Sequence, residues 1–266
     1  MLGAVLGDIV GSLYEFDNIK TKDFPLFTDE NFFTDDTVMT FAIFSALDKC
    51  DGNYENLEQQ TVYEMRRFYE LYPKKSYGYN FTSWLISSDP KPYNSFGNGS
   101  AMRVSAVPYF CKNIKDVINL SRKVTCPTHN HPEGLKGAEA TAVCIWLALN
   151  KKDKNFIKTF VEETYYPLNY DYKNLVENYT FQASCQETVP QAIYCFLISN
   201  SFEDAVRTAV FVGGDCDTLT AITASIAGAY YGIDEELEYK TLSYLDPHLR
   251  TLYNRFKTIK NKNFKK

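Results

Sequence analysis

Apolar residues recur at intervals of three and four positions along most of this chain, and that spacing limits the fold more than any other feature. Residues three and four apart lie on one face of a helix, so the pattern predicts helices. We expect them near residues 2–14, 36–49, 55–71, 99–110, 114–124, 132–150, 154–164, 185–199, 202–211 and 216–231, with a last helix over LDPHLRTLYNRF. No two β-rich runs flank a hairpin turn. The sequence therefore predicts an all-α fold, built as a bundle of many helices.

The chain is expected to form a single domain over residues 1–266. Its turn-rich joints, such as YPKKSYGYN and CPTHNHPEG, are too short and too mixed in composition to be domain linkers. A hydrophobic content of 45% is enough for a substantial core, and this excludes a disordered chain. No coiled-coil or assembly motif occurs, so a monomer is the default expectation.

Charge and cysteine usage narrow the classes of function. A net charge of −5 gives no electrostatic reason to expect nucleic-acid binding. The seven cysteines form no CxxC pair and several lie in apolar runs, which favours reduced thiols in a cytoplasmic protein. The apolar N-terminus lacks a basic region and is interrupted by Asp8, so we do not expect a signal peptide. No apolar run approaches the roughly 18 residues of a membrane helix.

Glycines at every fourth position mark one face of the first predicted helix. Gly3, Gly7 and Gly11 lie on one stripe, and each costs about 1 kcal/mol relative to alanine inside a helix. Close backbone contact with another helix or a ligand would offset that cost. We expect contact with the helix in TAITASIAGAYYG, through small residues on its surface: Ala221, Ser225 and Gly228.

Two short clusters, TDDT at 34–37 and GGDCDT at 213–218, place acids and threonine at predicted helix starts. Thr34 or Asp35 can cap the first of these helices, and Asp215 or Asp217 the second. Capping explains either cluster taken alone. It explains the second less well, since a helix start needs only one cap.

If the two clusters converge, four aspartates would repel one another unless cations neutralise them. Hard oxygen ligands suit Mg²⁺, Mn²⁺ or Ca²⁺ better than zinc, and two divalent ions balance four carboxylates. The candidate metal ligands are Thr34, Asp35, Asp36, Asp215, Asp217 and Thr218. Glu15, at the end of the first predicted helix, could belong to this group or be a surface acid.

The stretch FGNGSAMRV is a candidate binding loop. Gly97 and Gly99 leave the backbone open, and Ser100 follows Asn98 at a predicted helix start. Free N–H groups and a hydroxyl in that position suit a phosphate. A plain glycine turn with an Asn or Ser cap explains the same residues.

Two of the three histidines fall in THNHPEG. His129 and His131 are two positions apart, so they point in different directions and make a poor chelating pair. For His131 a turn with a helix cap is an equally good explanation. Arg103, near the glycine loop, could make a structural ion pair.

In combination these motifs resemble those of the ADP-ribosylglycohydrolase family. Five blocks occur in the family's order: GAVLGDIVGSLYE (3–15), TDDTVMT (34–40), GNGSAMR (97–103), THNHPEGLKGAEA (128–140) and GGDCDT (213–218). The resemblance implies a compact all-α bundle with orthogonally packed helices and a centre of two Mg²⁺ or Mn²⁺ ions. It implies ligation of one ion by Thr34, Asp35 and Asp36, a bridging Asp217, and ligation of the other by Asp215, Thr218 and Glu15.

The resemblance also implies an activity, the hydrolysis of the glycosidic bond between ADP-ribose and an acceptor such as arginine in a protein. The implied partner is an ADP-ribosylated protein or a small ADP-ribose conjugate. The implied catalytic residues are Asp35 or Asp36, which would accept a proton from water, and Glu15, which would position the acceptor. The implied substrate-binding residues are Gly97, Asn98, Gly99, Ser100, Met102 and His129. Cys216, where the family more often has Ser or Thr, is expected to be dispensable, and the segment from Phe16 to Asn31 is expected to shape acceptor specificity.

Two alternatives remain open from sequence. The first is a relative without catalysis that binds ADP-ribose or has a structural role. The second is a two-metal hydrolase of another nucleotide derivative, which the glycine loop would also accommodate.

Overall fold

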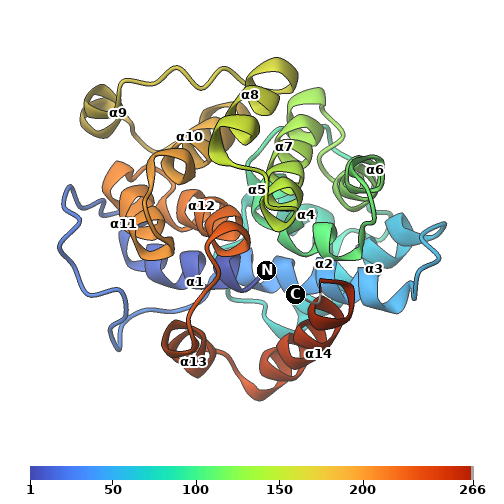
Figure 1. Ribbon diagram of the computed structural model, residues 1–266. Helices are drawn as coiled ribbons and strands as arrows, with labels where there is room; N and C mark the ends of the chain where they lie inside the picture. Colours follow the sequence, from blue (N-terminus) through green and yellow to red (C-terminus); the bar gives the residue numbers. More distant parts are fainter. Residues whose placement is uncertain (265–266) are drawn as a thin grey trace.

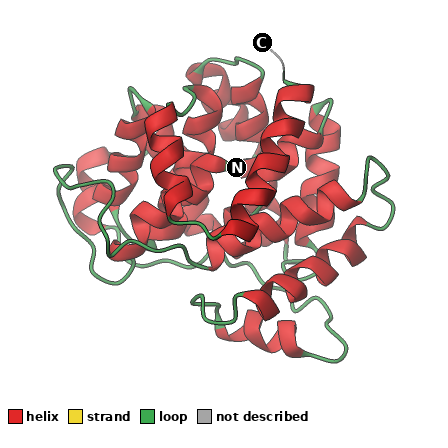
Figure 2. Cartoon of the chain, turned by 90° about the horizontal axis from the view of Figure 1, so that it is seen from below, coloured by secondary structure: helices red, strands yellow, loops and turns green. Residues whose placement is uncertain are grey.

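The computed structural model describes residues 1–264, and within that range helices are joined by loops and turns (Figure 2). The only β-pairing among these residues is an isolated bridge between Gly97 and Ser184. The all-α prediction is therefore confirmed. In chain order the helices are α1 (Leu2–Gly11), η1 (Ser12–Tyr14), α2 (Asp35–Lys49), α3 (Leu57–Leu71), α4 (Tyr79–Ile86), α5 (Gly99–Met102), η2 (Val104–Phe110), α6 (Ile114–Thr125), α7 (Pro132–Leu149), α8 (Lys154–Thr164), α9 (Tyr172–Asn178), α10 (Cys185–Ile198), α11 (Phe202–Val212), α12 (Cys216–Tyr230), α13 (Glu235–Ser243) and α14 (Pro247–Asn263).

Helices α1 and α12 pack backbone to backbone near the centre of the bundle (Figure 1). A Cβ atom added to Gly3 would collide with the Ala224 carbonyl, and one added to Gly11 would lie 2.5 Å from the Asp217 Cα. The predicted pairing of these two helices is correct. The predicted surface is correct only in part, because Gly228 faces Ile233 rather than α1.

The close approach of α1 and α12 positions the site. It brings the C-terminal end of α1 to the N-terminal end of α12, where GGDCDT lies. Every residue of α1 is buried, and the core beside it includes Val5, Ile9, Leu219 and Ile222. Burying an aliphatic side chain of this size contributes roughly 1.5–3 kcal/mol, so the core can offset the cost of the glycines.

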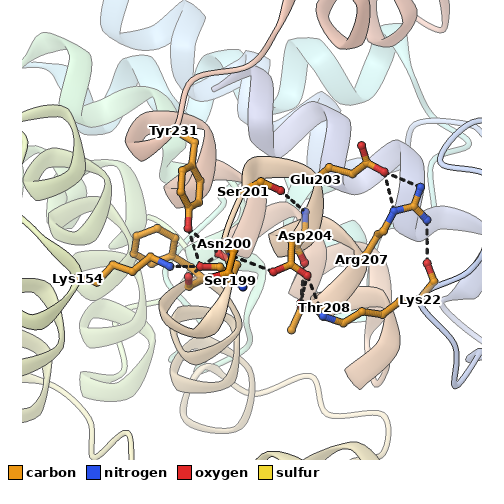
Figure 3. Close-up of polar contacts among 11 residues, drawn as sticks. Lys22, Lys154, Ser199, Asn200, Ser201, Glu203, Asp204, Arg207, Thr208 and Tyr231 are labelled. Atoms are coloured by element: carbon orange, nitrogen blue, oxygen red, sulfur yellow. Dashed lines mark hydrogen bonds and ion pairs between the residues drawn. The ribbon is translucent and has the colours of Figure 1, made fainter.

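The loop between η1 and α2, which showed no motif in the sequence, is tied to α11 (Figure 3). Lys22 Nζ donates to Asp204 Oδ1 (2.9 Å) and to the Thr208 hydroxyl (2.7 Å). In return, Arg207 donates to the carbonyl oxygens of Lys22 (2.9 Å) and Phe24 (2.7 Å). These contacts fix the loop along α11, and Lys20 Nζ, which donates to the Val212 carbonyl at 2.6 Å, fixes it at the end of that helix, next to the turn that precedes α12.

Three helices were absent from the sequence prediction: α4, α9 and α13. They are short, and α13 buries only Thr241, so they carry too little of a buried face to produce a clear periodic pattern. The predicted helix 99–110 is divided into α5 and a 3₁₀ segment, η2, that contains Pro108. Among residues 1–264 there is no helix with the length and apolar character needed to span a membrane.

Candidate active site

The start of α2 is held in place by Asp8, a fully buried carboxylate on α1. Asp8 accepts hydrogen bonds from the backbone N–H groups of Thr34 (2.9 Å) and Thr37 (3.1 Å) and from the Thr34 hydroxyl (2.8 Å). Thr34 is the N-cap of α2, and its hydroxyl oxygen accepts from the Asp36 N–H (3.2 Å). The predicted capping by Thr34 is confirmed. The carboxylates of Asp35 and Asp36 are therefore not needed to cap α2.

The acids at the start of α12 are likewise not used as caps. Asp215 occupies the N-cap position but makes no capping hydrogen bond from its side chain. Its Oδ2 accepts instead from the Asn98 side-chain amide at 2.7 Å. Asp217 Oδ1 accepts the N–H of the adjacent Thr218 at 2.8 Å. The capping explanation thus fails to account for Asp215, whose carboxylate is held by a residue more than a hundred positions away.

A turn with two left-handed glycines joins α11 to α12. Gly213 and Gly214 both have φ of 78°, a conformation that favours glycine. The side chain of Asn18 accepts the Gly214 N–H (2.6 Å) and donates to the Gly214 carbonyl (3.0 Å) and the Tyr14 carbonyl (2.5 Å). Asn18 therefore fastens the segment that carries Glu15 to the start of α12.

The two acidic clusters converge. The Thr218 hydroxyl on α12 donates to Asp36 Oδ1 on α2 at 3.2 Å. Oxygen atoms of Glu15, Asp215 and Asp217 all lie within 4.8 Å of one another. Motifs about 180 residues apart thus meet at one place, which we call the acidic end: Glu15, Asp35, Asp36, Asp215, Asp217 and Thr218.

Within residues 1–264 the carboxylates of the acidic end have no ion-pair partner among Lys, Arg and His. Burial, and then the charge of Asp217, raise the pKa of Asp36 well above its ordinary value, and burial with Asp215 does the same for Asp217. Burial, followed by the charges of Asp217 and Asp8, raises the pKa of Glu15 to about 7.

The donor set fits divalent metal ions. Asp36 is 3% exposed, and its Oδ2 is buried without any hydrogen-bond partner. An unpartnered carboxylate oxygen is costly to bury, and a cation is the partner that would satisfy it. The surrounding donors are all oxygen atoms, which suit Mg²⁺ or Mn²⁺. The acidic end is therefore a group that could hold a metal. The observation that supports a metal there is the unpartnered Oδ2 of Asp36 on α2.

The acidic end opens into a cleft of about 440 Å³, a size in the usual range for small-molecule sites. Besides the acids, the cleft is lined by Ser76, Gly78, Tyr79, Asn80, Phe81, Tyr93, Ser95, Gly97, Asn98, Gly99, Met102, Arg103, His129, Phe181 and Ala183. Most residues predicted to bind metal or substrate therefore border one cavity. Thr34 and Ser100 do not.

The glycine loop offers fewer free groups than its sequence suggests. The Asn98 N–H donates to the Ala183 carbonyl at 2.8 Å, and the Ser100 N–H to the Gly97 carbonyl at 3.4 Å. The Ser100 hydroxyl is buried and donates to the Gly134 carbonyl at 2.8 Å. It is therefore not free to donate to a ligand, although the sequence predicted that it would bind substrate. Gly99 retains a free N–H among the described residues. Helix α5 has only four residues, so its dipole adds little.

The histidines of THNHPEG have different roles. His131 is the N-cap of α7, and its Nδ1 accepts the Glu133 N–H at 3.1 Å, so the capping explanation is confirmed for it. His129 is 4% exposed and borders the cleft. Its ring lies beside Arg103, which forms no ion pair among the described residues, contrary to the structural alternative noted for it.

A second, smaller hollow of about 260 Å³ adjoins the acidic end. It is lined by Glu15, Phe16, Asn18, Phe181 and Gly214, and two of these residues, Glu15 and Phe181, also line the main cleft. Phe16 and Phe181 stack with ring centroids 6.1 Å apart and remain 83% and 49% exposed. Two stacked, exposed aromatic rings therefore border the same hollow as Glu15.

The fold agrees with comparisons to known proteins. Residues 1–259 match the ADP-ribosylglycohydrolase family, and the chain belongs to that family. The chain is thus an enzyme of the ADP-ribosylglycohydrolase class, a class whose activity is hydrolysis of a bond to ADP-ribose.

Individual relatives are distant in sequence. ADP-ribosylhydrolase ARH3 of Homo sapiens is 25% identical over 311 residues, covering 88% of this chain and 85% of that protein. ADP-ribosylarginine hydrolase Tri1 of Pseudomonas putida (strain GB-1) is 25% identical over 88% of this chain and 70% of that protein. A solved structure titled ADP-ribosylglycohydrolase-related protein complex has the same fold, with a TM-score of 0.69 over 97% of this chain and 95% of that chain at 23% identity.

No functional role was predicted for Asp8, and only a structural ion pair was considered for Arg103. Asp8 holds the start of α2, and Arg103 contacts Thr128 and His129 beside the glycine loop. Asp8 was noticed only because it interrupts an apolar segment. A charged residue in an otherwise apolar, buried helix requires partners, and that requirement was a usable signal.

Proposed function

We propose that this enzyme releases ADP-ribose from a modified acceptor by adding water at the anomeric carbon of the ribose, with the help of two divalent ions, Mg²⁺ or Mn²⁺. The observation that carries the proposal is the convergence of the two acidic clusters, seen in the 3.2 Å contact between the Thr218 hydroxyl and Asp36 Oδ1. Without cations, this arrangement buries several carboxylates with no compensation.

The proposed metal ligands are those predicted from sequence: Thr34, Asp35, Asp36, Asp215, Asp217 and Thr218. Two divalent ions would balance the charge of the four aspartates. Bound there, they would supply Lewis acidity, which orients ribose hydroxyls and makes water a better nucleophile. Thr34 already donates to Asp8 and accepts from the Asp36 N–H, so its hydroxyl oxygen has one lone pair left.

Asp35 and Asp36 would have different roles in the reaction. Asp35 is partly exposed at the cleft and its side chain makes no hydrogen bond to another described residue, so it can accept the proton of the attacking water. Asp36 is buried with one oxygen on Thr218 and is better suited to hold a metal. A sugar that loses its leaving group develops positive charge, and the nearby carboxylates stabilise that charge.

The residues that line the cleft support a position for the substrate. We place the ribose that bears the acceptor at the acidic end, and the diphosphate toward Gly97, Gly99 and His129. Asn98 and Met102 lie between these ends, and Tyr93 and Phe81 offer aromatic faces for the adenine. Ser100 would support the loop from behind through its bond to the Gly134 carbonyl.

For the acceptor we propose arginine in a protein. Glu15 and Phe181 border both cavities, and Phe16, which stacks on Phe181, borders the smaller one. In this arrangement they lie next to the anomeric carbon. A guanidinium group suits this surface, because a carboxylate attracts its charge and aromatic rings stack on its plane. A cytoplasmic location, a monomeric state and the lack of a nucleic-acid partner remain predictions from the sequence.

The test is to incubate the protein with ADP-ribosylated arginine, ADP-ribosylated serine and O-acetyl-ADP-ribose, with Mg²⁺, Mn²⁺ or a chelator. Release of ADP-ribose that stops with the chelator and in Asp217→Ala is the expected result, with arginine the preferred acceptor. Binding of ADP-ribose without turnover of any substrate would contradict catalysis. Release of AMP or inorganic phosphate would indicate a different hydrolase.

A further inference from the structure

The ring of His129 is held on one side by two polar groups. Its Nδ1 lies 2.7 Å from the Thr128 hydroxyl and 3.5 Å from Nη2 of Arg103. The same Nη2 donates to the Thr128 hydroxyl oxygen at 2.7 Å. Arg103, Thr128 and His129 therefore form a continuous chain of contacts that ends at the imidazole ring.

These contacts determine which nitrogen of His129 carries the proton. A guanidinium can only donate, so Arg103 favours an acceptor at Nδ1, but at 3.5 Å its contact is the weaker of the two. With Arg103 donating to its oxygen, the Thr128 hydroxyl is free to donate to Nδ1. The other acceptor within reach of the Thr128 hydroxyl is the Thr125 carbonyl. It is farther away, at 3.4 Å, and already accepts the N–H groups of Thr128 and His129. The proton of a neutral ring therefore belongs on Nε2.

The opposite side of the ring faces the glycine loop. His129 Nε2 makes no hydrogen bond within residues 1–264 and lies 3.5 Å from the place where a Cβ of Gly99 would stand, and 3.6 Å from that of Gly97. Burial, and then the charge of Arg103, lower the pKa of His129 well below its ordinary value, so the ring is neutral. A buried N–H donor thus points into the space that the two glycines leave open.

Arg103 is unusual in its surroundings. The residue is 1% exposed and forms no ion pair among the described residues, and its Nε has no hydrogen-bond partner. Its guanidinium carbon lies 5.7 Å from the centre of the Phe81 ring. A buried, uncompensated cation is costly, and an anion bound in the adjoining cleft would offset that cost.

We propose that Arg103 and Thr128 are positioning residues that fix His129 in the Nε2–H tautomer, so that it donates to a phosphoryl oxygen in the space above Gly97 and Gly99. The ligand class rests on the proposed function, which supplies a diphosphate. The tautomer rests only on the contacts of Arg103, Thr128 and His129. Arg103 acts through its hydrogen bond to Thr128, in the chain of contacts that we call the relay, and through its charge. It need not touch the ligand.

The first measurement is the tautomer of His129 in the free protein, from ¹⁵N-detected NMR of the histidine side chains. The chain has only three histidines, so His131→Asn and His248→Asn variants suffice to assign the spectra. The wild type should show a neutral ring with its proton on Nε2. Thr128→Val keeps the side-chain shape but removes the hydroxyl, and it should raise the Nδ1–H population, while Thr128→Ser should restore the wild-type spectrum.

The second measurement is the binding of ADP-ribose, with adenosine as a ligand that lacks phosphates. Loss of one well-oriented hydrogen bond corresponds to roughly a three- to tenfold weaker affinity. We expect that loss for ADP-ribose in Thr128→Val, no loss for adenosine, and recovery in Thr128→Ser. Thr61→Val is the matched control, since Thr61 is a fully buried threonine on α3 whose hydroxyl has no partner.

The outcomes separate this inference from the proposed function. A wild-type ring with its proton on Nδ1, or unchanged ADP-ribose affinity in Thr128→Val, would overturn the inference and leave the proposed function intact. A wild type that shows the Nε2–H ring but binds no ADP-ribose would contradict the proposed function and the ligand assigned here, while the relay itself would stand.

Discussion

A buried acid lies near each end of helix α2, and the two acids differ in their ion-pair partners and in the direction of their pKa shifts. Near its C-terminal end, Glu64 of α3 is fully buried and receives Lys49 Nζ at 2.5 Å, Arg67 at 2.8 and 2.9 Å and Gln60 at 3.2 Å. Burial alone would raise the pKa of Glu64, but the bonds from Lys49 and Arg67 outweigh it and lower the pKa. At the N-terminal end of α2, Asp36 is buried among other acids and forms no ion pair with any described residue, and its pKa is raised.

The difference distinguishes a structural acid from a functional one. At Glu64 the chain supplies the counterions, so the folded state is stable by itself. Among the described residues the acidic end has no ion-pair partner, and Arg103 is a buried cation that forms no ion pair. The cleft therefore has an excess of negative charge at one end and of positive charge at the other. That distribution suits metal ions bound at the acidic end and the phosphates of a ligand bound near Arg103.

The largest expected effect is on catalysis. Asp36→Asn keeps the shape of the side chain but removes a charge that the proposed metals require, so ADP-ribose release should fall by at least about 1,000-fold. Initial rates at saturating Mg²⁺ or Mn²⁺ measure this. Asp48→Asn, at the other end of α2 in a surface ion pair with Arg255, is the control and should retain wild-type activity. Activity within tenfold of wild type in Asp36→Asn would remove Asp36 from the proposed mechanism.

The next effect concerns metal and pH. A carboxyl group whose pKa is raised in the folded state binds protons more tightly when folded, so its contribution to stability falls as pH rises from its unfolded pKa of about 4. This is the case for Asp36 and Asp217 without metal. Divalent ions at about 100 times their Kd should stabilise the protein by roughly 2.7 kcal/mol.

The gain in Tm on adding Mg²⁺ or Mn²⁺ should therefore be larger near about pH 8 than near about pH 5.5, where protons already neutralise part of the cluster. Thermal unfolding with metal and with a chelator measures the gain at each pH. In the chelated protein, Asp36→Asn should raise the Tm, because it removes one of the repelling charges. The absence of any metal-dependent shift, or a shift that shrinks as pH rises, would contradict the metal site.

Glu64→Gln should lower the free energy of unfolding, by less than divalent ions are expected to raise it. It leaves Lys49 and Arg67 without their acid, and because both are partly exposed the expected loss is about 2 kcal/mol rather than the larger penalty of a fully buried pair. Urea unfolding measures it, with the exposed Glu70→Gln on the same helix as control.

The pH dependence of this contribution has the opposite sign to that of the acidic end. A lowered folded pKa means that the contribution of Glu64 is complete above its unfolded pKa of about 4.3 and is lost as pH falls through the folded value. If Glu64→Gln proved neutral while Asp36→Asn destabilised the metal-free protein, the contrast drawn between the two acids would be wrong.

Much of the site could be predicted from sequence because its residues lie at helix starts, where local patterns are strong. Thr34 as an N-cap and the pairing of α1 with α12 followed from spacing and from the glycine stripe. The meeting of Asp36 with Thr218 did not follow, since no local pattern records which helix ends touch. The ordered motifs of the family resemblance supplied that step.

Other parts could not be predicted because they depend on long-range contacts. Asn98 was expected to bind substrate, yet its amide holds Asp215, Thr188 and the Gln182 carbonyl. Ser100 looked like a phosphate ligand, but a neighbouring carbonyl on α7 accepts its proton. In both cases the local sequence specifies an available polar group, and only the packing decides which partner receives it.

The smallest expected effect tests the segment that follows Glu15, which carried no motif. Phe16→Ala and Phe181→Ala each remove one ring of the exposed stacked pair beside Glu15. If that pair holds the arginine of the acceptor, KM for ADP-ribosylated arginine should rise about fivefold, the size expected for an exposed cation–π contact of about 1 kcal/mol, with little change in kcat.

The matched control for that prediction is Phe156→Ala, which removes an exposed ring of another stacked pair, Phe156 and Phe160 on α8. It should leave both KM and kcat unchanged. O-acetyl-ADP-ribose lacks a cationic acceptor, so its KM should respond less to loss of Phe16 or Phe181. An equal rise for both substrates would mean that the rings close the cleft around ADP-ribose itself, and the choice of arginine would then depend on Glu15 alone.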